Sequence, residues 1–387
     1  MKTLILEALR AKEGDALIMQ SEGVTVMIDA GPPGVYRKTV KKRLKAFDKG
    51  DVDPPDIDLL MVSHVDSDHI AGVLDLTGEL IEADDERERP LVRVKEAWHN
   101  SFADILAEPV AAQPSGVREA AFELVSMADS DPVFALQMPD ARVVLESVSQ
   151  GRRLRHDLGR LNIDFNRKFK NHVVLRETAV APWQHGDLKL TVIGPSRDEL
   201  EKLKKEWVKQ LPAILAKERA KEADLAAAKK LDESVFNLAS IVAIAEVGTK
   251  SILLTGDARG DMIMNWLEKT GHTDGRAHFD ILKIPHHGSD RNVTVEFFSN
   301  VTANHYMVSA NGKHGNPEPE MFEMLFEARP GDDYLIHMTY GPDELAVHHD
   351  FDTAGFKKVL NRSADRRKRL WFPAPDENSI SITLKDG

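Results

Sequence analysis

Two histidines and two aspartates stand within one short run of the chain, residues 63–69, which reads Ser-His-Val-Asp-Ser-Asp-His. The run follows directly on the apolar stretch Ile57–Val62, which is typical of a buried β-strand. Because the strand ends there in a turn, the polar side chains can converge on one or two metal ions. The four predicted ligands are His64, Asp66, Asp68 and His69.

The same residue types also gather where no metal binds. Aspartate and histidine are common in solvated turns and at helix N-termini, and Asp68 would be a suitable cap for a helix that begins near Ile70. Three further motifs downstream, each at the end of an apolar strand, favour the metal-binding interpretation.

The downstream motifs carry carboxylate, imidazole and ammonium groups. Asp257 follows a buried strand within Leu-Leu-Thr-Gly-Asp-Ala, where an uncompensated charge would cost several kcal/mol, so this carboxylate needs a cationic partner. The second motif reads Pro-His-His-Gly-Ser, and the third reads Asn-Gly-Lys-His-Gly-Asn-Pro. Their candidate site residues are His286, His287, Lys313 and His314.

Composition limits the chemistry of the site. The 387 residues include 15 histidines and no cysteine, so disulfides, zinc ribbons and thiol nucleophiles are excluded and any metal must be bound by His, Asp, Glu or Asn. No apolar run reaches the roughly 18 residues of a membrane span. The N-terminus becomes charged at Glu7, too early for a secretory signal, so we expect a cytoplasmic protein. A net charge of −12 excludes a generally basic surface but not a local one.

Strand and helix patterns alternate along the chain, which favours β-sheets covered by helices. We expect one domain over 1–387, with an elaborated region at 81–186 that contains a basic patch, Arg152–His156, and a C-terminal extension at 331–387 whose last strand rejoins the sheet. Residues 197–231 are rich in Ala, Lys, Glu and Leu and predict a helical insertion. Its charged side chains form either a solvated face or a surface for a protein partner.

Taken together, the motifs resemble those of the metallo-β-lactamase fold, and specifically those of the hydrolase domain of the competence protein ComEC and its stand-alone relatives. Asp66 replaces the second histidine of the usual His-x-His-x-Asp-His signature. The first three motifs match almost letter for letter, whereas in the fourth two residues separate His314 from Pro317. The resemblance covers roughly 3–80 and 187–326 of the chain.

The resemblance implies an α/β fold of the α+β kind, an αββα sandwich with a site for two divalent ions at one edge of its two sheets. Carried over by position, the implied ligands are His64 and Asp66 for one ion, Asp68, His69 and one histidine of the His286–His287 pair for the other, and Asp257 for both. The family's third histidine for the first ion has no clear counterpart, and the candidates are His99, His185 and Asn237.

The implied activity is that of a metal-dependent hydrolase, most simply a phosphodiesterase or nuclease in which a metal-bridging hydroxide attacks phosphorus. In this hypothesis Asp257 and Asp68 orient the nucleophile. His314 or Lys313 stabilises the transition state or protonates the leaving oxygen. Asp66 makes the site harder and more anionic, which shifts the preference toward manganese or magnesium while zinc is still accepted. The expected cofactor is two divalent ions, zinc or manganese, with magnesium also compatible.

Two other functions fit the same pattern. The chain could hydrolyse a small ester, a lactone or a phosphorylcholine-type substrate, or it could be a non-catalytic, metal-stabilised module that binds a protein partner through the insertion at 197–231. The expected partner of the leading hypothesis is nucleic acid or another phosphodiester, with no membrane involved. A wide, positively lined cleft would favour a nuclease, and a narrow apolar pocket would favour a small-ester hydrolase.

Overall fold

The computed structural model describes residues 2–101, 105, 139–202, 237 and 239–386. The predicted helical insertion lies outside the described residues from 203 onward, and much of the elaborated region at 81–186 lies outside them as well.

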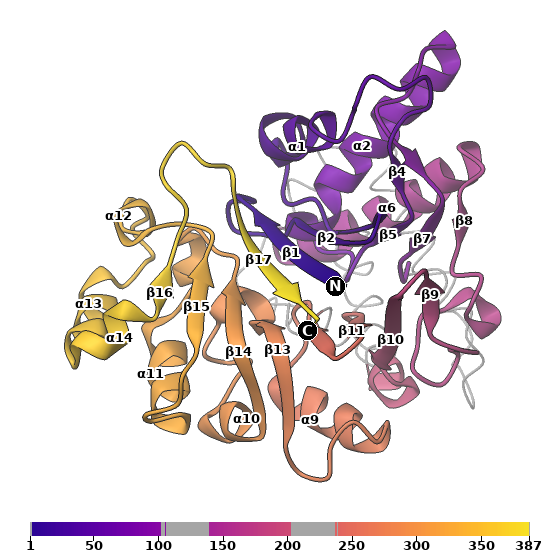
Figure 1. Cartoon of the computed structure of the whole chain (residues 1–387). Coiled ribbons are helices and arrows are strands. Elements are labelled where there is room, and N and C mark those ends of the chain that lie inside the picture. The colour runs from indigo at the N-terminus through magenta and orange to yellow at the C-terminus, as the bar shows by residue number, and fades with distance from the viewer. Residues whose placement is uncertain (1, 102–104, 106–138, 203–236, 238, 387) are drawn as a thin grey trace, which may run out of the picture.

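Two large β-sheets face each other, and helices cover their outer sides (Figure 1). The first sheet has the order β17-β1-β2-β3-β5-β7-β8 and the second the order β16-β15-β14-β13-β12-β11-β10-β9. The strands of the first sheet are β1 (Thr3–Leu9), β2 (Leu17–Ser21), β3 (Val24–Ile28), β5 (Leu59–Met61), β7 (Glu96–Trp98), β8 (Asp164–Phe165) and β17 (Ser379–Lys385). Those of the second are β9 (Trp183–His185), β10 (Leu188–Gly194), β11 (Val242–Val247), β12 (Lys250–Leu254), β13 (Ala277–Lys283), β14 (Val301–Val308), β15 (Leu335–Met338) and β16 (Leu370–Trp371). A small pair, β4 (Asp56–Ile57) and β6 (Arg93–Val94), lies apart from both.

Three apolar cores correspond to the interfaces of this sandwich. One joins the inner faces of the two sheets, where residues such as Leu6 and Val26 share a cluster with Ile252 and Ile281. The other two join each sheet to its own helices. The helices are α1 (Lys41–Lys45), α2 (Ser67–Glu86), α6 (Pro139–Arg160), α9 (Gly260–Lys269), α10 (Val295–Asn300), α11 (Pro319–Ala328), α12 (Pro342–Leu345), α13 (Thr353–Asn361) and α14 (Ala364–Lys368). Helix, sheet, sheet and helix form the layers that the sequence predicted, and the predicted fold class is confirmed.

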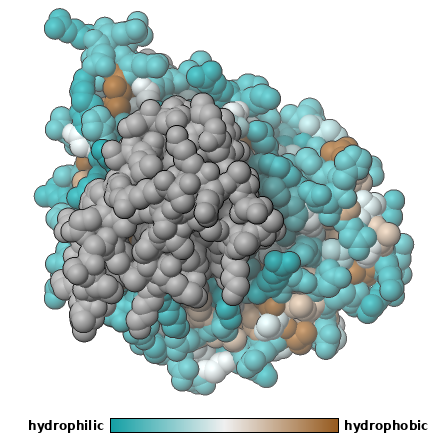
Figure 2. All heavy atoms as spheres, turned by 180° about the vertical axis from the view of Figure 1, so that it is seen from behind, coloured by the Kyte–Doolittle hydropathy of each residue, from teal (hydrophilic) through white to brown (hydrophobic). Residues whose placement is uncertain are grey.

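The C-terminal segment is part of the first sheet. β17 pairs with β1 in antiparallel register from Thr3 opposite Lys385 to Leu9 opposite Ser379, which confirms the prediction that the last strand rejoins the sheet. In Figure 1 this strand crosses in front of β13 and β14 of the second sheet. No described helix is long and apolar enough to cross a membrane. The described atoms on the face in Figure 2 are mostly hydrophilic.

Parallel pairing brings the chemically important strand ends together. β3, β5, β7 and β8 are parallel in the first sheet, as are β12, β13, β14 and β15 in the second. The carboxyl ends of parallel strands lie at the same edge of a sheet, which is where ligands bind in such folds. All four motifs of the sequence follow strands of these two groups, so they meet at one edge of the sandwich.

Asp68 is not a helix cap. The alternative to metal binding made it the cap of a helix beginning near Ile70, but α2 begins at Ser67 with Asp66 at its N-cap, and the Asp66 side chain makes no capping hydrogen bond. The earlier start places Asp68 and His69 inside the first turn. Both side chains are therefore held by a regular helix rather than by a loop.

Candidate metal centre

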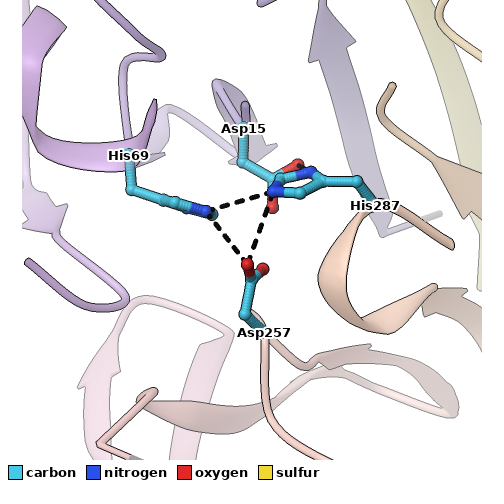
Figure 3. Close-up of side chains that lie close together, drawn as sticks. All are labelled: Asp15, His69, Asp257 and His287. Atoms are coloured by element: carbon cyan, nitrogen blue, oxygen red, sulfur yellow. Dashed lines mark hydrogen bonds and ion pairs between the residues drawn. The ribbon is translucent and has the colours of Figure 1, made fainter. Parts of the chain in front are cut away.

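Four buried side chains from distant parts of the chain meet at the edge of the sandwich (Figure 3). They are Asp15 from the turn between β1 and β2, His69 from the first turn of α2, Asp257 after β12, and His287 after β13. One ligand atom of each lies within 4.8 Å of one ligand atom of every other. Three of the four were predicted as site residues from the sequence, and Asp15 was not.

The Oδ2 atom of Asp257 lies at the centre of the cluster. The Nε2 atoms of four histidines surround it, at 3.5 Å for His69, 3.5 Å for His287, 3.7 Å for His286 and 3.8 Å for His64. Burial alone would raise the pKa of Asp257, but the imidazoles more than offset it and hold this pKa well below its usual value. Within the described residues Oδ1 of Asp257 has no hydrogen-bond partner, so this buried carboxylate has room for a cation.

His64 and Asp66 form one side of the centre. Nε2 of His64 lies 3.5 Å from Oδ2 of Asp66, and it has no hydrogen-bond partner among the described residues although the ring is 2% exposed. The other ring nitrogen, Nδ1, lies 3.1 Å from the Ser63 hydroxyl. A buried nitrogen without a partner is costly unless something binds it, and a metal ion would do so.

Asp68, His69 and His287 form the other side. Oδ2 of Asp68 lies 3.4 Å from Nε2 of His287 and 3.8 Å from Nε2 of His69, and the two Nε2 atoms are 3.2 Å apart. Burial would raise the pKa of Asp68, yet the two imidazoles lower it to about 2. Burial conversely lowers the pKa of both histidines, but neighbouring carboxylates, Asp257 foremost, raise it well above the usual value. The cluster therefore stabilises positive charge at this point.

A second layer of hydrogen bonds orients the two buried histidines. The Asp29 carboxylate accepts a hydrogen bond from Nδ1 of His69 (2.8 Å), and it also accepts from the hydroxyl (2.6 Å) and the amide (2.7 Å) of Ser63. Nδ1 of His287 donates to the carbonyl of Ser309 (3.0 Å). With their Nδ1 protons engaged, both rings present Nε2 to the centre, which is how metal-binding histidines are usually held.

Asp15 supports the centre from the opposite sheet. Its Oδ2 lies 2.6 Å from Nζ of Lys283, and its Oδ1 lies 3.6 Å from Nδ1 of His287. Because the Lys283 ammonium already pairs with it, we interpret Asp15 as a group that orients His287 rather than as a ligand. The signal that could have found it was a carboxylate at a turn directly before the apolar strand β2.

The candidates for the missing third ligand lie in different places. His185 lies 3.4 Å from Asp58, which precedes β5, so it is at the end of the sheet opposite to His64. His99 follows β7 at the correct edge and is buried, and neither ring nitrogen has a partner among the described residues. Nδ2 of Asn237 lies 3.3 Å from Nδ1 of His286.

The structure places both histidines of the His286–His287 pair beside Asp257, whereas the sequence assigned only one of them as a ligand.

Lys313 and His314 lie in a short 3-10 turn near this edge, Lys313–Gly315. Nζ of Lys313 pairs with the Glu13 carboxylate, and His314 has a left-handed backbone conformation with φ of 58°. Asn316, two residues on, donates to the carbonyl of His286 (3.4 Å). Among the described residues neither the Lys313 nor the His314 side chain forms a hydrogen bond or ion pair with the predicted ligands.

The donor set fits divalent metal ions. It offers imidazole nitrogens and carboxylate oxygens without a thiolate, and this combination suits zinc, manganese and iron. The unpartnered Nε2 of His64 and Oδ1 of Asp257 are buried polar atoms that such ions would satisfy.

Comparison with known proteins supports this chemistry at the level of the superfamily. Residues 10–117 match the model of the Metallo-beta-lactamase superfamily, a range that includes the turn after β1 and the whole His64–His69 run. Members of this superfamily are generally metal-dependent hydrolases. No curated protein matches the chain.

Several solved structures are similar to this chain at low identity. The metallo-beta-lactamase fold protein YhfI from Bacillus subtilis is 10% identical, with 87% of this chain and 96% of that chain covered and a TM-score of 0.39. The diiron beta-hydroxylase CmlA from Streptomyces venezuelae is 12% identical, with 98% and 54% covered and a TM-score of 0.39. Zn(2+)-bound PqqB from Methylobacterium extorquens is 10% identical, with 99% and 100% covered and a TM-score of 0.35.

Proposed function

We propose that this chain is a metal-dependent phosphodiesterase that acts on nucleic acid. The observation that carries the proposal is the arrangement around Oδ2 of Asp257, where one carboxylate oxygen is shared by four imidazoles at 3.5–3.8 Å. The remaining predicted ligands lie on two sides of this carboxylate oxygen, and each side forms one group. We assign His64, Asp66 and His286 to one ion, Asp68, His69 and His287 to the other, and Asp257 to both.

Two divalent ions bound by these residues would supply an activated water and would stabilise the attacking and leaving oxygens of a displacement at phosphorus. The residues of the chain have separate tasks around them. Asp29 and the Ser309 carbonyl hold the Nδ1 protons of His69 and His287, which keeps both rings aimed at the centre. Asn292 accepts from Nδ1 of His286 (2.8 Å) and donates to the backbone carbonyl of Asp257 (3.0 Å), so it links the two residues.

The accessible side of the centre indicates where substrate enters. The side chains of Asp68 and His286 are each 32% exposed and that of Asp66 is 16% exposed, while His64, His69, Asp257 and His287 are at most 3% exposed. The buried ligands would therefore hold the ions on the side away from solvent. An anionic phosphodiester would approach from the side of the three exposed ones, and the carboxylates there favour hard cations such as manganese over softer ones.

The test combines metal content with hydrolysis of two substrates. Native protein should bind two ions per chain and hydrolyse both bis(p-nitrophenyl) phosphate and single-stranded DNA with manganese. Asp257→Asn should lower both rates by about a hundredfold or more, since it weakens both ligand groups. Asp261→Asn is the matched control, because Asp261 is an exposed aspartate that pairs only with Arg259 among the described residues.

Two results would contradict the proposal. One is native protein that binds two ions and cleaves neither substrate, which would favour the non-catalytic module. The other is activity that survives Asp257→Asn together with an unchanged metal content.

A further inference from the structure

One segment of this acidic protein is strongly basic. Residues 152–176 contain eight Lys and Arg and two Asp, a net charge of +6, whereas the whole chain has a net charge of −12. The segment comprises the last turns of α6, the strand β8 and a 3-10 turn at Lys170–His172. A local concentration of positive charge on an acidic protein attracts anions to that place.

Strand pairing places this segment beside the candidate metal centre. β5, which leads into His64, pairs with β7, and β7 pairs with β8, all in parallel. Two strand spacings amount to roughly 10 Å, so the end of β8 lies about that far from the end of β5 along the edge of the sheet.

Helix α6 contacts the run 63–69, which carries four of the predicted ligands. Nε2 of Gln150 donates to the hydroxyl of Ser67 (3.2 Å), which stands between Asp66 and Asp68. A Cβ atom on Gly151 would lie 3.2 Å from a methyl group of Val65, so the backbone of the helix packs closely against Val65. Arg155 lies four residues after Gly151, one turn along the same side of the helix.

Aromatic rings and a guanidinium group adjoin each other at the end of β8. Cζ of Arg155 lies 5.5 Å from the centre of the Phe165 ring, His99 stacks on the same ring at 5.8 Å, and the exposed His172 ring lies 6.0 Å from it. Asn166 holds this arrangement, because its Nδ2 donates to the carbonyls of His99 (2.6 Å) and His172 (2.7 Å). Exposed rings and guanidinium planes are surfaces on which unpaired bases stack.

Two lysines of the segment remain available for an anion. Arg160 pairs with Asp84 and Asp85, and Arg167 pairs with Asp164. In contrast, Nζ of Lys168 and of Lys170 forms no hydrogen bond or ion pair with any described residue. The two lysines flank Phe169 in the sequence, and Lys170 begins the 3-10 turn that ends at His172.

From these contacts we propose that the surface formed by Arg155, Lys168, Lys170 and His172 binds a single strand of nucleic acid next to the metal centre. The proposal rests on the proposed function, and it names the substrate as single-stranded rather than duplex. The lysines bind phosphates, and the His172 ring and the Arg155 plane stack with bases. A duplex would present its phosphates but not the faces of its bases.

The test measures binding separately from cleavage. Fluorescence anisotropy of a labelled oligothymidylate is recorded against salt concentration with the full chain in EDTA, so that no hydrolysis occurs. The double variant Lys168→Gln, Lys170→Gln should lower the slope of log K against log salt by about 1.4, because each phosphate contact on a single strand contributes roughly 0.7. Lys357→Gln, Lys358→Gln is the matched control, since these exposed lysines lie on α13 at the opposite side of the molecule (Figure 1).

The stacking contact has its own variants. His172→Ala should lower the affinity without changing the salt slope, and His172→Phe should restore it because a ring is present again. Hydrolysis of bis(p-nitrophenyl) phosphate should be unchanged in every variant, since this small diester does not reach the surface.

Several outcomes would overturn the inference. One is that the oligothymidylate does not bind at low salt, and another is that the two lysine double variants lower the salt slope equally. The others are that duplex DNA or polyglutamate binds as tightly as the oligothymidylate. If any of these occurs while the small diester is hydrolysed, the surface is wrong and the proposed phosphodiesterase stands. If oligothymidylate binds as expected but no diester is cleaved, the proposed function is wrong and the surface stands.

Discussion

A buried ion pair between the two sheets offers a quantitative test of how the centre is supported. Lys283, at the end of β13, and Asp15, in the turn between β1 and β2, are both 1% exposed and lie 2.6 Å apart. Burial by itself raises the pKa of Asp15, but the charges of Lys283 and His287 more than offset it and lower this pKa below its usual value. The carboxylate is therefore ionised and depends on its cationic partners.

Removing the lysine charge should be strongly destabilising. Lys283→Met leaves the buried Asp15 carboxylate without its closest cation, and breaking a buried pair in this way costs about 3–5 kcal/mol. We expect the lower end of this range, about 3 kcal/mol, because His287 still lies 3.6 Å from Oδ1 of Asp15. Adding Asp15→Asn removes the stranded charge, so the double variant should be more stable than Lys283→Met alone.

Urea unfolding of the two single variants and the double variant, in EDTA, gives the coupling free energy. The control cycle uses Lys189 and Glu246, a cross-strand pair of β10 and β11 at 2.9 Å whose side chains are 42% and 35% exposed. This exposed pair should couple by less than about 1 kcal/mol. A double variant as unstable as the sum of the singles, or a coupling no larger than in the control, would refute the reasoning.

Three further predictions concern other parts of the centre. Gly14→Ala should destabilise the fold by about 1–3 kcal/mol in urea unfolding, because a Cβ there would lie 1.8 Å from the backbone oxygen of Asp68, and equal stability would contradict this contact. Burial lowers the pKa of His99 from 6.5 to about 4, so as the pH falls the unfolded chain binds this proton before the folded chain does. The free energy of unfolding should therefore fall by about 3 kcal/mol between pH 6.5 and pH 4. His99→Leu should remove this part of the pH dependence when unfolding is measured across the same range. Manganese at a hundredfold excess over its Kd should raise unfolding stability by about 2.7 kcal/mol for each ion bound, about 5.4 kcal/mol for two, in native protein and by much less in Asp257→Asn, whereas equal gains would place the ions elsewhere.

The sequence predicted the fold well wherever local pattern decides structure. The apolar runs that lead into His64, Asp257 and His286 are strands in the structure, because short β-rich runs closed by glycine or proline have few alternatives. The alternative that made Asp68 a helix cap was wrong, since an aspartate can occupy several positions at the start of a helix. In α2 the N-cap is Asp66, and Asp68 lies in the first turn.

The sequence predicted most but not all residues of the metal centre, and strand topology explains the difference. Residues that end parallel strands reach a common edge by topology alone, so the motifs identified most of the cluster. Asp15 and its partner Lys283 lie on different sheets, and their contact depends on how the two sheets pack. Adjacent residues give no information about that packing. The position of His286 beside Asp257 depends likewise on a left-handed backbone with φ of 47°, which the sequence did not indicate.

The charge balance of the centre connects the two proposals. Before a bridging hydroxide is counted, three ligand carboxylates, from Asp66, Asp68 and Asp257, would leave two divalent ions with one uncompensated positive charge, because the imidazoles bind metals in their neutral form and Asp15 is neutralised by Lys283. A histidine in place of Asp66 would leave two. A centre with this weaker attraction for phosphate gains more from positive charge placed beside it, and the basic surface at 152–176 supplies such charge about two strand spacings away. Asp66→His should therefore tighten the binding of a small phosphate ester to the metal-loaded protein, and it should leave the lysine-dependent salt slope of oligonucleotide binding unchanged.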